Sequence, residues 1–197
     1  YNSILLVLLP GIDQKEILGY AAALAEDHQS TLTVVEVLTE SSVGVEGDVS
    51  SPDELEEQMI ESRRRGLDSL VARLHLDLDI QTNILVGRPH EEITREVVIN
   101  GRDLVLKVSE SRRGLKERLF GDADSRLIKA CPCPVLLVRS IPSKPYRHRR
   151  ICAGVYQDEH PGGHRDDRYE INHRILKNAT WLATAQFAEL HIVHVWE

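Results

Sequence analysis

The chain has 197 residues, of which 42% are hydrophobic and 28% are charged, and these proportions predict an ordinary globular protein. Its 31 acidic and 24 basic residues give a net charge of −7, which disfavours nucleic acid and anionic membranes as partners. No apolar run is long enough to cross a membrane, and three cysteines without a C-x-x-C pair indicate buried, reduced thiols in a cytoplasmic protein.

Apolar segments typical of strands alternate with amphipathic segments typical of helices along the first 140 residues. In chain order we predict strand 4–9, helix 14–27, strand 32–38, helix 51–74, strand 80–86, helix 90–99, strand 104–108, helix 122–130 and strand 135–138. The first strand, ILLVLL, is continuously apolar, as parallel strands buried on both faces usually are. The alternation predicts βαβ units with right-handed crossovers, and therefore an α/β fold with a parallel sheet.

The pattern of the first helix and second strand recurs near the end of the chain. At one constant offset Ile17 aligns with Ile175, and the register continues without a gap until Val37 aligns with Val195. A register kept from helix to strand favours a duplication. We predict three parts, a first domain, a linker and an incomplete second copy, at 1–140, 141–149 and 150–197. Because the second copy supplies only a strand, a helix and a strand, we expect its apolar face to need a cover and the chain to be part of a longer protein.

The first copy resembles the universal stress protein (Usp) superfamily in three stretches. They are VGRPHEEI at 86–93, DLVL at 103–106, and GLKERLFG at 114–121 with CPCPVLLV at 131–138. The resemblance implies a doubly wound, open, parallel five-stranded sheet of order 3-2-1-4-5, and a stress-response role without known catalysis. The second copy, which contains AELHIVHV, is similar to the start of another Usp domain. The resemblance therefore implies the tandem type, with another Usp domain as partner in the same chain or in a homodimer.

The loop after the fourth strand departs from that of nucleotide-binding family members, which carry Gly-x2-Gly-x9-Gly-Ser/Thr. Val108 and Ser111 stand at the first two glycine positions, Gly121 is kept, and Asp122 replaces the hydroxyl residue. Leu9 stands where those members usually have Asp at the end of the first strand. Val108 is β-branched and resists the close backbone approach that glycine permits, and Asp122 places a negative charge where a phosphate would lie.

We therefore predict a degenerate nucleotide site that holds neither ATP nor another cofactor. Its residues are Leu9, Pro10, Val37, Val108, Ser111, Gly121 and Asp122. The same loop also contains four basic residues: Arg112, Arg113, Lys116 and Arg118. They leave an alternative open, because they could neutralise phosphate in a shifted pose, although a solvated basic surface is the interpretation we prefer.

Other candidate residues give weaker signals. His90 precedes two glutamates, but carboxylates in a first helical turn complement the helix dipole, and we predict no catalytic residue. His160 and His164 lie near several aspartates, yet the two glycines between them indicate a flexible loop, and we predict no metal site. Cys131 and Cys133 are either inert strand thiols, which is the interpretation we prefer, or a redox sensor.

The sequence thus predicts a non-catalytic Usp that serves as a stress-response binding or dimerisation module. The alternative is an ATP-binding, weakly hydrolysing Usp switch, and a redox or metal enzyme of the same fold has less support. We expect the apolar fifth strand to lie at the sheet edge and to pair with another Usp domain. The residues of this dimer edge are Val135, Leu136, Leu137 and Val138.

Overall fold

The structure is a computed structural model, and it describes residues 1–9, 14–39, 52–74, 78–109, 122–138, 148–155 and 165–194. It divides into two compact units, Tyr1–Ile141 and Pro142–Glu197. The described part of the first unit contains nine elements: β1 (Ser3–Leu8), α1 (Lys15–His28), β2 (Thr31–Leu38), α2 (Pro52–Ala72), β3 (Ile80–Val86), α3 (Pro89–Asn100), β4 (Leu104–Val108), α4 (Asp122–Ala130) and β5 (Val135–Val138).

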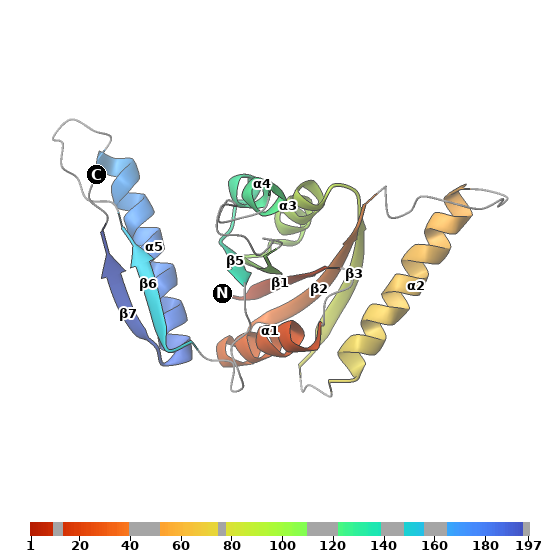
Figure 1. The fold of residues 1–197 in the computed structure, drawn as a ribbon, viewed down its shortest axis with the longest axis horizontal. Coiled ribbons are helices and arrows are strands. Elements are labelled where there is room, and N and C mark those ends of the chain that lie inside the picture. The colour runs from red at the N-terminus through yellow and green to blue at the C-terminus, as the bar shows by residue number, and fades with distance from the viewer. Residues whose placement is uncertain are drawn as a thin grey trace, which may run out of the picture. The chain divides into compact units, whose positions relative to one another are not determined.

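The five strands of the first unit form one parallel sheet in the order β3-β2-β1-β4-β5. This arrangement confirms the predicted doubly wound α/β fold. The central strand β1 pairs with β2 on one side and β4 on the other, and its residues from Ile4 to Leu8 are all buried (Figure 1). β5 lies at one edge of the sheet, as the sequence predicts.

Helices cover both faces of the sheet because the chain reverses its direction of travel across the sheet after β3 (Figure 1). Helices α3 and α4 pack on one face, where Ile93, Val97 and Leu127 join a buried cluster of valines and Leu5 from the strands. Helices α1 and α2 lie over the other face. There Arg63 of α2 approaches the buried carboxylate of Glu36 on β2, with 3.5 Å between Nη1 and Oε1.

Most element boundaries agree with the sequence prediction to within about two residues. Strands β3, β4 and β5 and helix α4 have the predicted limits. Proline and glycine mark the two ends of α3, with Pro89 in its first turn and Gly101 in the left-handed conformation, φ 63°, directly after it. This left-handed position favours glycine because a Cβ would be strained there.

The prediction of buried strand thiols is wrong. Cys131 and Cys133 are half-buried and lie between α4 and β5 rather than on a strand. Cys152 lies on a strand but is exposed. The segment around the first two cysteines contains Pro132 and Pro134, which lack the N–H that a strand ladder needs, so β5 begins only at Val135.

In its described residues the second unit contains two parallel strands and one helix: β6 (Arg150–Gly154), α5 (Arg165–Gln186) and β7 (Glu189–Val193). This is the predicted strand, helix and strand, although α5 begins four residues earlier than expected. Gln186 is buried, and its Oε1 accepts a hydrogen bond from the main-chain N–H of His148 at 2.7 Å. On β7, Ile192 and Val193 are 58% and 40% exposed, so part of the predicted apolar face is uncovered.

Candidate functional site

Ligands of doubly wound sheets bind beyond the carboxyl ends of the strands, at the point where the strand order reverses. In this sheet the reversal lies between β1 and β4, which run parallel with Val7 beside Lys107. Both strands therefore end at the same edge. Leu9 follows β1 and is half-buried, and its carbonyl oxygen accepts a 3.0 Å hydrogen bond from Gln14 Nε2 at the start of α1.

The predicted nucleotide-site residues fall partly inside and partly outside the described chain. Val108 ends β4 and is half-buried, beside the switch point. Val37 is a member of the core cluster beneath α3 and α4, where it packs rather than lines an open surface. The others cannot be placed as side chains: Pro10, Ser111 and Gly121 lie outside the described residues, and Asp122 begins α4 but its side chain lies outside the description.

The structure adds a buried ion pair at this edge that the sequence analysis missed. The ammonium group of Lys107, on β4, lies 2.9 Å from Asp124 Oδ1, in the first turn of α4. The two side chains are 2% and 0% exposed. Ser109 completes the arrangement, since its hydroxyl donates a 2.9 Å hydrogen bond to the other carboxylate oxygen, Oδ2. Three side chains thus join the end of β4 to the start of α4.

The helix N-terminus and Lys107 together stabilise the buried carboxylate of Asp124. A carboxylate in the first turn of a helix lies in the favourable field of the helix N-terminus. Asp124 occupies that field from inside the protein, and Lys107 balances its charge. Burial of a single charge costs several kcal/mol, so both members depend on their partner. The N-terminus of α4, the place where an anionic ligand would bind in such a fold, already carries its own carboxylate.

A signal for this pair was present in the sequence. Lys107 interrupts the apolar run LVLKV on a strand that the expected order 3-2-1-4-5 places inside the sheet rather than at an edge. A lysine there needs a buried acidic partner, because lysine is almost never fully buried unless it is paired. The partner could not be named from sequence, since Asp124 is separated from Lys107 by the whole loop that precedes α4.

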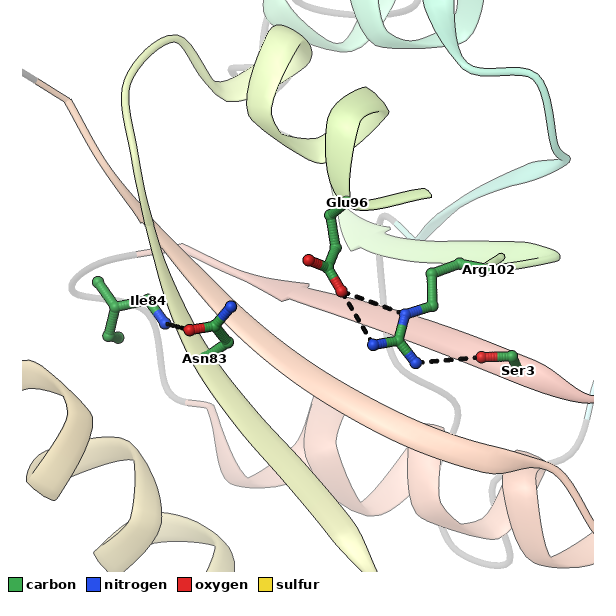
Figure 2. Close-up of polar contacts among 5 residues, drawn as sticks. All are labelled: Ser3, Asn83, Ile84, Glu96 and Arg102. Atoms are coloured by element: carbon green, nitrogen blue, oxygen red, sulfur yellow. Dashed lines mark hydrogen bonds and ion pairs between the residues drawn. The ribbon is translucent and has the colours of Figure 1, made fainter. Parts of the chain in front are cut away.

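The amino ends of the strands carry a second polar cluster, which has a structural role. Figure 2 shows the guanidinium of Arg102 between Glu96 of α3 and Ser3 of β1, with Nη2 2.9 Å from Glu96 Oε1 and Nη1 3.2 Å from Ser3 Oγ. Both members of the Arg102–Glu96 pair are nearly buried. The Asp103 carboxylate accepts hydrogen bonds from the main-chain N–H groups of Asn2 and Ser3 at 2.8 and 3.0 Å. These contacts connect the start of β1 with the end of α3 and the residues before β4.

The remaining candidates do not form a catalytic or metal-binding group in the described part of the chain. The carboxylates after His90 pair with arginines of their own helix region, Glu91 with Arg88 at 3.2 Å and Glu92 with Arg95 at 3.0 Å. Among described residues, no three His, Cys, Asp or Glu side chains gather as metal ligands would. His160 and His164 lie outside the described residues.

Comparison with known proteins agrees with the fold and with the family resemblance of the sequence. The model of the "Universal stress protein family" matches residues 1–139. The chain belongs to this family. Universal stress protein E of Escherichia coli K12 is 30% identical over 149 residues, which cover 73% of this chain and 45% of that protein. The universal stress protein E homolog of Haemophilus influenzae is 27% identical over 174 residues, which cover 81% of this chain and 56% of that one.

A solved structure extends the likeness to the fold of nearly the whole chain. The crystal structure of a putative universal stress protein from Pseudomonas aeruginosa covers 98% of this chain and 61% of its own, with a TM-score of 0.65 and 21% identity. This chain spans about half the length of the curated Usp relatives it matches. In the described part of this Usp, no helix combines the length and the apolar character that a membrane span requires.

Proposed function

We propose that this protein is a non-catalytic universal stress protein whose first unit serves as a stress-response binding or dimerisation module with a degenerate nucleotide loop. The observation that supports this proposal is the buried Lys107–Asp124 pair, with Ser109 as its third member, at the carboxyl edge of the sheet. A phosphate at this edge would need the N-terminus of α4 and a cation. In this protein the carboxylate of Asp124 occupies that helix turn, and the same carboxylate neutralises Lys107, the buried lysine at this edge.

The magnitude of the effect is large enough to decide between binding and no binding. Two like unit charges about 4 Å apart repel by about 4 kcal/mol at an effective dielectric constant near 20. That energy corresponds to roughly a thousandfold loss of affinity. Asp122, in the first turn of α4, is the carboxylate that would exert this repulsion, since Lys107 balances the charge of Asp124. Removal of the glycine positions at Val108 and Ser111 adds a steric obstacle to the electrostatic one.

The partner in this proposal is another Usp domain, bound through the open edge of β5. Three residues of this edge strand, Val135, Leu136 and Leu137, are half-buried, and β5 pairs with β4 on only one side within the described sheet. An apolar edge with unpaired main-chain groups is prone to pair with another strand. We place this role in the cytoplasm, where thiols remain reduced, because all three cysteines are unbridged.

The experiment is a calorimetric titration of the 197-residue chain with ATP and Mg²⁺. We expect no saturable binding in the micromolar range. A triple variant, Val108→Gly, Ser111→Gly and Asp122→Ser, should gain affinity, since it restores the glycines and the hydroxyl of nucleotide-binding members. A matched control, Asp27→Ser on the exposed end of α1, removes one negative charge far from the loop.

Each outcome of the titration separates the proposals. If the parent chain binds ATP with micromolar affinity, the degenerate-loop proposal is wrong and the ATP-binding switch is favoured. The basic residues of the loop would then be the groups that neutralise the phosphates. A triple variant that binds no better than the parent would contradict the account of the loop residues. Gain of affinity in the Asp27→Ser control would show that net charge, rather than the loop, limits binding.

A further inference from the structure

Two cysteine side chains approach each other just before β5, at the amino edge of the sheet and away from the candidate nucleotide site. The Sγ atoms of Cys131 and Cys133 are 3.6 Å apart and share a hydrogen bond. Both side chains are half-buried, so they are accessible to small molecules while they keep a defined position. We propose that Cys131 and Cys133 form a dithiol–disulfide redox site, with Cys131 as the attacking sulfur, Cys133 as the resolving sulfur, and a low-molecular-weight disulfide as the oxidant.

The backbone holds the two thiols in place on both sides. The N–H of Cys131 donates a 2.9 Å hydrogen bond to the carbonyl of Leu127 in α4. On the other side, the carbonyl of Pro134 accepts a 3.0 Å hydrogen bond from the N–H of Val105 on β4. Between these anchors the prolines restrict the backbone torsions. A pair of groups held at short range reacts as if at high concentration, so the second sulfur is well placed to resolve a mixed disulfide.

The environment distinguishes the two sulfurs chemically. The Cys133 thiol and the main-chain N–H of Cys133 stabilise the Cys131 thiolate and lower the pKa of Cys131 to about 7. Cys133 has the opposite shift: its role as hydrogen-bond donor to Cys131, burial and the negative charge of Asp103 all raise its pKa. Tyr1 is another titratable group close to Cys133, and burial with Asp103 and Cys133 raises the pKa of its phenol to about 12. Near neutral pH the thiolate form is therefore populated at Cys131 rather than at Cys133.

The reaction balances with a small disulfide such as oxidised glutathione. The Cys131 thiolate attacks one sulfur of the disulfide, the S–S bond breaks, and a thiolate leaves and takes a proton from solvent. Cys133 then loses its proton to solvent and its sulfur attacks Cys131 Sγ, which releases the second thiolate. The protein dithiol loses two electrons and two protons, and the small disulfide becomes two thiols. The Sγ atoms must approach by about 1.5 Å to reach the usual S–S bond length near 2.05 Å.

The first experiment needs no variant of the pair. The 197-residue chain, with Cys152→Ser to remove the exposed thiol on β6, is equilibrated in glutathione redox buffers at pH 7. The sample is then quenched in acid, alkylated and mapped by mass spectrometry. We expect the 131–133 peptide to lose two hydrogens and to carry no glutathione, and the change to reverse with a reductant. Stable mixed disulfides on both cysteines, or no reaction, would overturn the proposal.

A second experiment assigns the roles of the two sulfurs. With Cys133→Ala, a Cys131–glutathione mixed disulfide should accumulate, because no resolving sulfur is present. The rate of Cys131 alkylation by iodoacetamide should have its midpoint near pH 7 in the parent, and a higher midpoint in Cys133→Ala. Cys133→Ser keeps a hydroxyl donor and should restore part of the shift. Equal midpoints in the parent and Cys133→Ala would contradict the assignment of Cys131, with circular dichroism used to verify that each variant is folded.

Discussion

The buried Lys107–Asp124 pair gives the sharpest test of the architecture of the first unit. With 2.9 Å between Nζ and Oδ1, the Coulomb attraction is about 6 kcal/mol at an effective dielectric constant near 20. Most of this energy offsets the cost of removing both charges from water, so the intact pair contributes little net stability. Removal of one partner is different, because it leaves a buried charge without compensation. We expect such a variant to lose about 3–5 kcal/mol of unfolding free energy.

The two single variants should lose different amounts of unfolding free energy. In Lys107→Met, Asp124 keeps the hydrogen bond from Ser109 and the field of the helix N-terminus, so the loss of unfolding free energy should be about 3 kcal/mol. In Asp124→Asn, the buried ammonium group of Lys107 loses its carboxylate partner, so the loss of unfolding free energy should be about 5 kcal/mol. The double variant should cost clearly less than the sum of the two, because neither charge remains.

Amide hydrogen exchange of the full chain measures these changes in the first unit alone, since peptides from β1 and β4 report its global opening. A loss of about 3–5 kcal/mol corresponds to exchange that is faster by roughly two to nearly four powers of ten. Lys129→Met on the exposed side of α4 and Asp27→Asn on α1 repeat the chemical changes at exposed positions. Single variants that exchange like these controls, or a double variant that costs the full sum, would refute the argument.

Three further predictions concern other parts of the first unit. Gly101→Ala should lower the unfolding free energy by about 1 kcal/mol because φ is 63° there. Gly66→Ala lies in the interior of α2 with space for a Cβ and should raise the unfolding free energy by about 0.5–1 kcal/mol. Urea denaturation followed by circular dichroism measures both changes. Leu137→Lys on the β5 edge should reduce self-association in analytical ultracentrifugation, and unchanged association would count against that edge as the partner surface. Arg102→Lys keeps the charge but loses the forked contact to Glu96, so it should cost about 1–3 kcal/mol, while an exposed Arg→Lys change would cost almost nothing.

Much of the fold could be predicted because local signals and the global arrangement agree. Continuous apolar runs defined the strands, and residues that stop regular structure, such as Pro89 and Gly101, defined the ends of helices. The start of α5 was placed four residues too late because the residues before Tyr169 are charged and show no apolar period. Apolar periodicity carries no information about where a polar first turn begins.

The switch point of the strand order was predictable, but the side chains that meet beside it were not. The strand order fixes the edge where β1 and β4 end, and that order followed from the family resemblance. The internal pair depends on which face of β4 carries Lys107 and on which residue α4 presents to it, and both depend on tertiary packing. The same limit applies to the thiols, where a correct β5 boundary did not reveal that two sulfurs approach to 3.6 Å.

The position of the ion pair suggests why the first unit retains it despite its small net contribution to stability. Hydrophobic residues of similar volume would often serve stability equally well or better. Charged partners with three fixed contacts instead specify one arrangement, in which the start of α4 is tied to Lys107 and Ser109 at the end of β4. In a nucleotide-binding fold a bound phosphate satisfies the N–H groups and the dipole at this helix terminus. We infer that Asp124 meets part of that electrostatic need from within the chain.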